Sequence, residues 1–445
     1  MKTPIYDFVK KYEKENNVRL HMPGHKGHSL LGIEGIDITE LDGADSLYHA
    51  SGIIKESEEN ATRLFGSGAT LYSCEGSSLS VRAMCYLAMS YVGENKSPYI
   101  LATRNAHSSF ISASILLDFD IKWLYSRQND TYLSCKISAE DVENAFKSVD
   151  NLPFAVYITS PDYLGSILDI QEISKVCKKY GVPLLVDNAH GAYLKFLDNK
   201  SHPIDLGADM CCDSAHKTLP VLTGGGYLHI SKNAPGYFKE HAKEALSLFG
   251  SSSPSYLILS SLDKANEYIE NGYSDSLNSF ISELENAKKR LGVYGFTFLG
   301  DEKLKWTISA KEYGYTGTEL AFELKKQGVV CEFCDPDYLV LMFTPESKAD
   351  LERTENALYK IQRKEPILKK PSILVPPTKE MSTKKATFSN KELISIDNAN
   401  GRILASLNLT CPPAISVLVA GERFNESSVE LCKYYGYTCA YVVKE

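Results

Sequence analysis

Between about residues 70 and 230, short apolar segments alternate with stretches of helical periodicity, and this alternation restricts the possible folds more than any other feature. The two stretches at 138–149 and 169–181 carry helix signals, because a serine and acidic residues open the first, and lysines and a glycine close the second. This pattern predicts an α/β fold, in which a mostly parallel sheet is covered by helices on both faces. A ligand then binds beyond the carboxyl ends of the strands. The apolar segments are YILAT (99–103), IKWLY (121–125), FAVYITS (154–160), PLLVD (183–187) and ADMCCDS (208–214).

Composition excludes several classes of protein. The chain has 445 residues, 43% of them hydrophobic, which is enough for a large core in two or three domains. It contains no apolar stretch of about 20 residues, and its N-terminal segment is polar and charged, so we expect a cytoplasmic protein without a membrane partner. The net charge of -8 argues against nucleic acid as a partner. The eleven cysteines lack framework spacing, which indicates reduced thiols.

The segment 183–226 carries the strongest chemical signal. Asp187 ends one apolar segment, and Lys217 follows the next one, so both side chains are expected at the same edge of the sheet. Lys217 has Ser214 and His216 beside it and a glycine-rich turn after it, which suits an imine with an aldehyde whose phosphate needs nearby donors. An acid suits a pyridine nitrogen, because an anion keeps a pyridoxal ring protonated as an electron sink. Each motif alone is more often a helix cap or a surface pair, but together they predict pyridoxal 5'-phosphate as cofactor.

Two further motifs fit the same cofactor. Gly76, Ser77 and Ser78 precede a helical stretch, where backbone N–H groups and hydroxyls can hold a phosphate. The alternative is an ordinary serine-capped helix. His107 directly follows an apolar segment and could lie flat on an aromatic ring. Its alternative is a helix-capping turn with a histidine that faces solvent.

Nearly the whole chain resembles the ornithine/lysine/arginine decarboxylases of the aspartate-aminotransferase fold, in a short form without an extra N-terminal receiver-like domain. The resemblance implies pyridoxal-phosphate fold type I, with a large domain and smaller α+β C-terminal domains. It also implies decarboxylation of lysine, arginine or ornithine to the amine and CO₂, as in polyamine metabolism. The segments that carry it are LHMPGHKG (20–27), 40–67, GSS (76–78), RNAH (104–107), TSPDYLG (159–165), VDNAHGAY (186–193), SAHKTLP (214–220), 251–263 and CPPAISVLVAGERF (411–424).

The resemblance also implies roles for individual residues. Lys217 is then the Schiff-base lysine, Asp187 the partner of the pyridine nitrogen, and His107 the residue stacked on the ring. These three form the catalytic set, with His107 or Lys217 as proton donor. Members of the family generally act as homodimers or larger homo-oligomers, so His25 and Lys26 are candidates for a neighbouring subunit's site. The residues expected to hold or line the cofactor are Gly76, Ser77, Ser78, His107, Asp187, Ala189, His190, Ser214, His216 and Lys217.

The chain departs from the family pattern around the cofactor. Asn188 stands where glutamate is typical, Asp213 where glutamine is common, Ser108 where lysine is common, and 224–226 replace a more polar turn. Acidic residues in 40–45 are candidates for binding the basic side chain of a substrate.

Two alternative functions stay open. One is another fold type I enzyme, an aminotransferase or a lyase, although no arginine in the small domain stands out as the clamp a transaminase needs. The other is a non-catalytic regulatory homologue.

The domain organisation follows from changes of pattern along the chain. No metal site is expected, because Cys331 and Cys334 form a single CxxC without a second pair of ligands nearby. The expected parts are an N-terminal segment and arm (1–70), a cofactor-binding large domain (71–255), a small α+β domain (256–363), a linker rich in proline and lysine (364–388) and a C-terminal domain (389–445).

Overall fold

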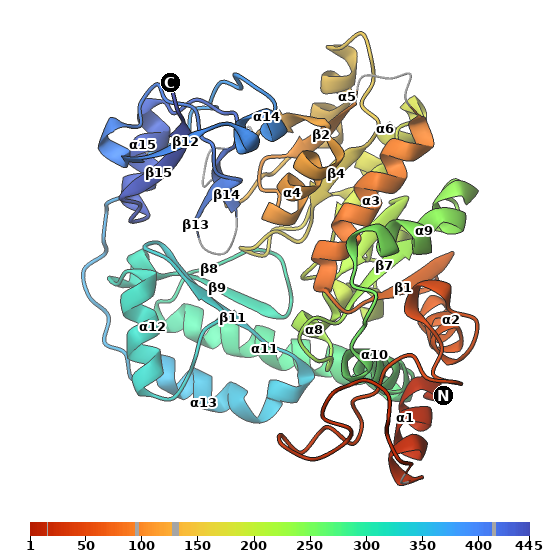
Figure 1. The fold of residues 1–445 in the computed structure, drawn as a ribbon. Coiled ribbons are helices and arrows are strands. Elements are labelled where there is room, and N and C mark those ends of the chain that lie inside the picture. The colour runs from red at the N-terminus through yellow and green to blue at the C-terminus, as the bar shows by residue number, and fades with distance from the viewer. Residues whose placement is uncertain (16, 94–97, 127–132, 412–414) are drawn as a thin grey trace. The chain divides into compact units, whose positions relative to one another are not determined.

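The computed structural model describes residues 1–15, 17–93, 98–126, 133–411 and 415–445 (Figure 1). Residues 412–414, which belong to the resembling segment 411–424, therefore lie outside the described part. Contacts divide the chain into two compact units. Unit 1 comprises Met1–Ser97, Asn151–Tyr157 and Ile170–Asp275, and unit 2 comprises Pro98–Asp150, Ile158–Asp169 and Ser276–Glu445.

The principal sheet has seven strands in the order β1-β7-β6-β5-β4-β2-β3. Strands β5 and β6 run parallel, as do β2 and β3, whereas β7 is antiparallel to β1 and β6. The predicted α/β fold with a mostly parallel sheet is therefore confirmed, and all five predicted strands end within two residues of their predicted bounds. The strands are β1 (Ala69–Ser73), β2 (Tyr99–Thr103), β3 (Asp120–Leu124), β4 (Val156–Thr159), β5 (Leu184–Asp187), β6 (Met210–Asp213) and β7 (Gly226–Ile230).

In unit 1, helices cover both faces of the strands. Neighbouring strand residues point to opposite faces, so Asp187 and its register partner Cys212 share one face, while Cys211 and its partner His229 share the other. Helix α2 lies on the second face, where Phe65 has its ring 4.5 Å from that of His229. The helices of this unit are α1 (Pro4–Lys14), η1 (Leu47–His49), α2 (Ile53–Phe65), α3 (Gly76–Val92), α6 (Ile170–Tyr180), η2 (Ala192–Phe196), α7 (Pro203–Leu206), α8 (Ala215–Thr218), α9 (Gly236–Phe249), α10 (Tyr256–Tyr268) and η3 (Ile269–Tyr273).

The predicted helices form for the reasons that their sequences indicate. Helix α5 (Ala139–Lys147) starts with a capping box, in which Ser138 and Asp141 each bond the other's backbone N–H. Helix α6 buries Ile170, Ile173 and Cys177 on one stripe. The segment after Pro254 contains α10 and α11 (Ser274–Tyr294), joined by η3. Gly272 within η3 adopts a φ of 97°, which interrupts the regular helix.

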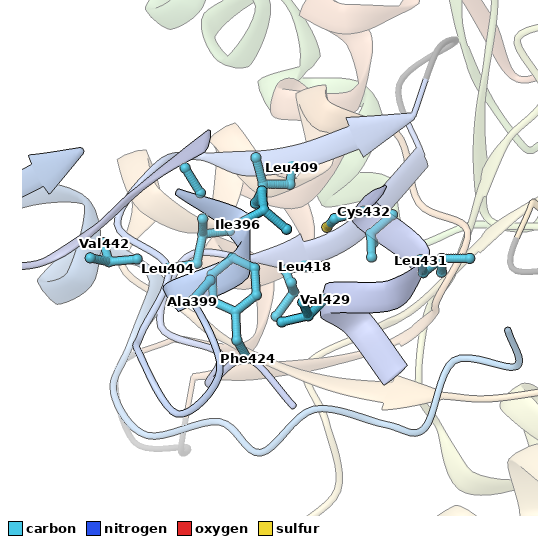
Figure 2. Packing of buried hydrophobic residues seen from close by; sticks show 12 residues of the cluster. Ile396, Ala399, Leu404, Leu409, Leu418, Phe424, Val429, Leu431, Cys432 and Val442 are labelled. Atoms are coloured by element: carbon cyan, nitrogen blue, oxygen red, sulfur yellow. The ribbon is translucent and has the colours of Figure 1, made fainter. Parts of the chain in front are cut away.

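Unit 2 contains a four-stranded sheet of order β10-β11-β9-β8 and two two-stranded sheets, β12-β15 and β13-β14. The segment 389–445 has its own apolar core, in which Val417, Leu418, Phe424 and Val442 are almost fully buried (Figure 2). The further elements of this unit are α4 (Ser108–Leu117), β8 (Phe298–Leu299), β9 (Lys305–Ser309), η4 (Ala310–Tyr313), α12 (Gly317–Lys326), β10 (Phe333–Cys334), β11 (Tyr338–Met342), η5 (Pro345–Ser347), α13 (Lys348–Tyr359), α14 (Thr383–Phe388), β12 (Lys391–Ser395), η6 (Ile396–Asn398), β13 (Asn408–Cys411), β14 (Ile415–Val419), α15 (Glu426–Tyr434) and β15 (Cys439–Val443).

The segment between α13 and α14 matches the pattern that suggested a linker. Residues 360–382, all of them described, contain no helix or strand and make one isolated bridge, from Lys379 to Glu422. The domain bounds themselves stay a prediction. Among the described residues, no helix is long and apolar enough to cross a membrane.

Candidate active site

Two neighbouring parallel strands, β5 and β6, position Asp187 and Lys217. Strand β5 ends at Asp187, which lies opposite Cys212 of β6. The chain leaves β6 at Asp213 and enters the short helix α8, which carries Lys217. Because parallel strands end at the same edge of a sheet, both residues belong to the carboxyl edge, as predicted.

The Asp187 carboxylate is enclosed by hydrogen-bond donors. The residue is 3% exposed. Its Oδ2 accepts a hydrogen bond from the Tyr157 hydroxyl at 2.8 Å, and its Oδ1 accepts one from the Ala189 N–H at 3.2 Å. Burial, together with the charge of Asp187, raises the pKa of Tyr157 well above its ordinary value. The phenol therefore stays protonated and keeps donating to the carboxylate. Burial and the same charge also raise the pKa of the Cys212 and Cys85 thiols.

Lys217 is half-buried and contacts His190. Its Nζ lies 3.0 Å from Nε2 of His190, which is on the turn that follows Asp187. A hydrogen bond at this distance needs a proton on one nitrogen and a lone pair on the other. The shared proton can therefore reside on Lys217 or on His190, and His190 lies in the turn that follows Asp187.

The predicted phosphate-binding residues of unit 1 also come together. Gly76, Ser77 and Ser78 form the first turn of α3 rather than preceding it, and the Ser214 hydroxyl donates to the Ser77 hydroxyl at 2.9 Å. His216 Nδ1 lies 2.8 Å from the Gly225 carbonyl oxygen and donates to it. This bond requires a proton on Nδ1, so in a neutral His216 the lone pair lies on Nε2.

Backbone conformation explains the glycine at 76, and close approach explains the one at 226. A Cβ on Gly76 would lie 3.6 Å from Cε1 of His216, and the residue has a φ of 64°, in the left-handed region. A Cβ on Gly226 would lie 2.9 Å from the backbone carbon of Gly76. The backbone of α3 therefore starts directly against the turn that follows Lys217, which brings the hydroxyls of the two segments together.

The opposite face of β6 carries a second buried acid. Asp213 Oδ1 accepts from Nδ2 of Asn188 at 2.7 Å, and its Oδ2 accepts from Nε2 of His202 at 3.1 Å and of His229 at 3.0 Å. Burial opposes ionisation, but the two imidazoles lower the pKa of Asp213 well below its ordinary value. Ligand atoms of His202, Cys211 and Asp213 lie within 4.8 Å of one another. Both imidazoles nevertheless meet the carboxylate at hydrogen-bond distance, which satisfies the acid without a metal ion.

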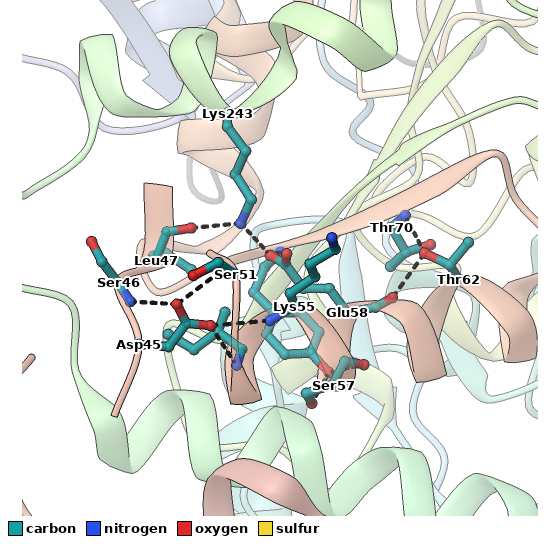
Figure 3. Close-up of polar contacts among 12 residues, drawn as sticks. Asp45, Ser46, Leu47, Ser51, Lys55, Ser57, Glu58, Thr62, Thr70 and Lys243 are labelled. Atoms are coloured by element: carbon teal, nitrogen blue, oxygen red, sulfur yellow. Dashed lines mark hydrogen bonds and ion pairs between the residues drawn. The ribbon is translucent and has the colours of Figure 1, made fainter. Parts of the chain in front are cut away.

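The acidic stretch 40–45, a candidate for reading a basic substrate, includes one acid that the fold already uses (Figure 3). The Asp45 carboxylate accepts hydrogen bonds from five backbone N–H groups between 46 and 55, at distances of 2.8 to 3.4 Å. Although burial opposes the shift, these donors lower the pKa of Asp45. Asp45 therefore caps the start of α2. Nearby, the buried Glu58 carboxylate accepts from the half-buried Lys243 at 2.6 Å.

His107 belongs to unit 2, and we assign no contact between it and the residues of unit 1. It follows β2 and caps α4, where its Nδ1 accepts from the Ser109 N–H at 3.1 Å. The helix-capping arrangement, weighed above as the alternative, is thus present. A neutral His107 carries its proton on Nε2. Its role against a cofactor ring stays a prediction.

Sequence reasoning missed Tyr157, His202 and His229 as neighbours of the site. A tyrosine inside an apolar strand needs an acceptor for its hydroxyl, so the FAVYITS segment did contain a signal for Tyr157. His229 gave none, because its contact with Asp213 depends on the register of β6 against β7, and His202 gave none, because it reaches Asp213 from the start of α7.

The arrangement fits pyridoxal phosphate. One edge offers an amine at Lys217, a carboxylate at Asp187 with two strong donors already in place, and hydroxyls of Ser77 and Ser214 at a helix start. A carboxylate oxygen has two lone pairs, so Asp187 retains capacity for a further N–H. The start of a 17-residue helix favours a phosphate, because its first N–H groups lack intrahelical acceptors.

Comparison with known proteins gives a consistent result. The sequence profile described as "Orn/Lys/Arg decarboxylase, major domain" matches residues 3–302, and that of the C-terminal domain of the same family matches 363–442. An uncharacterised Bacillus subtilis protein, YaaO, is 29% identical over 97% of this chain and 93% of its own length. An arginine decarboxylase of the same organism is 27% identical over 96% of this chain and 92% of its own length.

Solved structures show the same fold. The Francisella novicida lysine decarboxylase LdcF superposes with a TM-score of 0.80 at 18% identity, over 99% of this chain and 81% of that one. The constitutive lysine decarboxylase of Escherichia coli has a TM-score of 0.74 at 18% identity, over 100% of this chain and 82% of that one.

Proposed function

Because the chain belongs to the Orn/Lys/Arg decarboxylase family, we propose that it removes the α-carboxyl group of a basic amino acid with pyridoxal 5'-phosphate as its cofactor. The observation that carries this proposal is the convergence of Lys217, Asp187 and Ser214 on the carboxyl edge of β5 and β6. Lysine, arginine and ornithine are the candidate substrates. Relatives named arginine decarboxylase and fold neighbours named lysine decarboxylase both support this class.

The residues of unit 1 divide the task of holding the cofactor. Lys217 supplies the amine for its aldehyde, and Asp187 supplies the anion for its ring nitrogen. Ser77, Ser214 and the first turn of α3 supply donors for its phosphate, and His216 stands beside them. When bound, pyridoxal phosphate supplies an electron sink for the carbanion left by departing CO₂. Ala189 and His190, in the turn after Asp187, line the cofactor.

Other residues of the chain hold the Asp187 carboxylate in position and supply a proton to the product. Tyr157 and the Ala189 N–H hold the Asp187 carboxylate in place, and the raised pKa of Tyr157 prevents a second negative charge there. Lys217 and His190, whose side-chain nitrogens lie 3.0 Å apart, hold the proton that is transferred to the former α-carbon of the substrate. His107 is the second candidate for a proton donor, because its Nδ1 accepts a hydrogen bond and a neutral ring then carries its proton on Nε2.

Three further statements belong to this proposal. The enzyme is a cytoplasmic homodimer or larger homo-oligomer, its product feeds polyamine metabolism, and His25 and Lys26 face a neighbouring subunit's site. Gel filtration with light scattering tests the first: a single monomer peak at micromolar concentration would contradict it.

A substrate panel tests the activity. Purified protein with pyridoxal phosphate is offered lysine, arginine, ornithine and a neutral amino acid such as leucine, and the products are identified by mass spectrometry with CO₂ measured in parallel. We expect CO₂ and the matching amine from at least one basic amino acid and none from leucine. A keto acid without CO₂ would identify an aminotransferase instead, and cofactor binding with no product would favour a regulatory homologue.

A further inference from the structure

Asn188 and Asp213 contact each other, and each is next in sequence to a residue of the candidate cofactor site. Asn188 follows Asp187, and Asp213 precedes Ser214. The Asn188 amide Nδ2 donates to Asp213 Oδ1 at 2.7 Å, and both residues are fully buried. Two positions at which the chain departs from the family pattern, one directly after β5 and one at the end of β6, therefore contact each other, and their amide and carboxylate are complementary.

The Asn188 end of this contact fixes the turn after β5. The Asn188 N–H donates to the Cys212 carbonyl at 3.0 Å, and its own carbonyl accepts from the Gly191 N–H at 2.7 Å. A Cβ on Gly191 would lie 2.0 Å from Asn188 Oδ1, so this turn closes tightly over the amide. Ala189 and His190 lie within the turn, and their positions thus depend on how the Asn188 side chain is held.

The Asp213 end fixes the start of the segment that carries Lys217. Its Oδ2 accepts from His202 and His229, both fully buried. His229 Nδ1 in turn lies 2.8 Å from the Thr70 hydroxyl. The carboxylate is thereby anchored to β7 and β1, and Ser214 leaves β6 from this anchored position.

We propose that Asn188 and Asp213 form a positioning pair, which sets the turn that carries Ala189 and His190 in register with the Ser214–Lys217 segment. The pair requires opposite types of group, one amide and one carboxylate, at its two ends. The inference rests on the proposed function, because these two segments are the ones assigned to the cofactor.

The test is a cycle of three variants: Asn188→Asp, Asp213→Asn and the double variant that exchanges the two groups. Asn188→Asp alone places two carboxylates at hydrogen-bond distance in a buried site, where like charges repel strongly. We expect its affinity for pyridoxal phosphate to fall by about tenfold or more. The double variant restores one amide opposite one carboxylate, so its affinity returns to within about threefold of wild type.

Two measurements follow each variant. Titration of the visible absorbance of bound pyridoxal phosphate gives the affinity, and the thermal unfolding of the cofactor-free protein gives the coupling without cofactor. Asp209→Asn is the matched control, because Asp209 accepts a hydrogen bond from the Leu184 N–H at 2.8 Å beside the opposite end of β6. We expect this control to keep the wild-type affinity.

The outcomes separate the two proposals. If wild type binds pyridoxal phosphate and the double variant is no better than Asn188→Asp, the positioning pair is wrong and the cofactor site stands. If wild type does not bind pyridoxal phosphate, the proposed function fails, while rescue of the unfolding temperature in the double variant would still support the coupling of the two residues. If only the unfolding temperatures recover and the affinity does not, the pair is structural and the positioning role is overturned.

Discussion

Asp187 and Asp213 end neighbouring parallel strands, and both are buried, yet they point to opposite faces of the sheet and meet different partners. Asp213 is surrounded by three side-chain donors, two of them imidazoles. Asp187 accepts from the Tyr157 hydroxyl, from the Ala189 N–H and, at 3.6 Å, from the Cys212 thiol. Burial and strand position therefore do not distinguish the two acids, whereas the kinds of donor around them do: an amide and two imidazoles at Asp213, against a phenol, a backbone N–H and a weakly donating thiol at Asp187.

The largest effect should come from removing the Asp213 carboxylate. Asp213→Ala leaves two buried imidazole N–H groups and the Asn188 amide without their acceptor, which should lower the free energy of unfolding by about 3 kcal/mol. Urea unfolding of the cofactor-free protein measures this. Asp187→Ala is the matched variant and should lose less, because one of its three donors is the Cys212 thiol, which is a weak donor. An equal loss in both would remove the distinction between the two acids.

The next effect should appear in activity rather than stability. Asp187→Asn keeps the shape of the side chain and one acceptor oxygen. It removes the negative charge that is proposed to pair with the ring nitrogen of the cofactor, so kcat should fall by about 100-fold. The absorbance of bound cofactor should persist, since Lys217 and the phosphate donors are untouched. Steady-state CO₂ release on the best substrate of the panel gives the value. Wild-type turnover in this variant would exclude Asp187 from the chemistry.

The pH dependence of stability probes the Asp213 face. Burial lowers the pKa of His229, although the charge of Asp213 opposes the shift. As the pH falls below about 6.5, the unfolded chain therefore takes up a proton that native His229 does not, and stability decreases. Its contribution to the slope is up to about 1.4 kcal/mol per pH unit. In His229→Gln this contribution disappears, so the loss between about pH 7 and pH 5.5 should be smaller than in wild type. Identical losses would contradict a neutral buried His229.

The smallest effect concerns the phosphate donors. Ser77→Ala removes one hydroxyl and should weaken pyridoxal phosphate binding by about fivefold, which corresponds to about 1 kcal/mol. Ser80→Ala is the control, because Ser80 lies in the same helix but is fully buried in its packed interior. Absorbance titration measures both. A wild-type affinity in Ser77→Ala would place the phosphate elsewhere.

The main features of the fold were visible in the sequence. Continuous apolar runs such as 183–187 are typical of strands that are buried on both faces, and they lie where strands were expected. The helix start at Ser138 was also readable, because its capping box is local. The same holds for Asp187 and Lys217, whose common edge follows from strand order alone.

The remaining parts of the site depend on register and on contacts distant in sequence. Nothing local to Asp213 indicates that His202 and His229 will meet it, and nothing local to Asp45 indicates that it will accept five backbone N–H groups. His107 illustrates a third case, because a histidine after a strand suits a cap and a ring cover equally well, and only the Ser109 contact shows that it caps α4.

The central claim is that Lys217 carries the cofactor. It is tested by borohydride reduction of the purified protein with pyridoxal phosphate, followed by peptide mass spectrometry. The account predicts a reduced pyridoxyl group on the peptide that contains Lys217, and no labelled peptide above background in Lys217→Ala. A label on another lysine, unchanged in the variant, would contradict it.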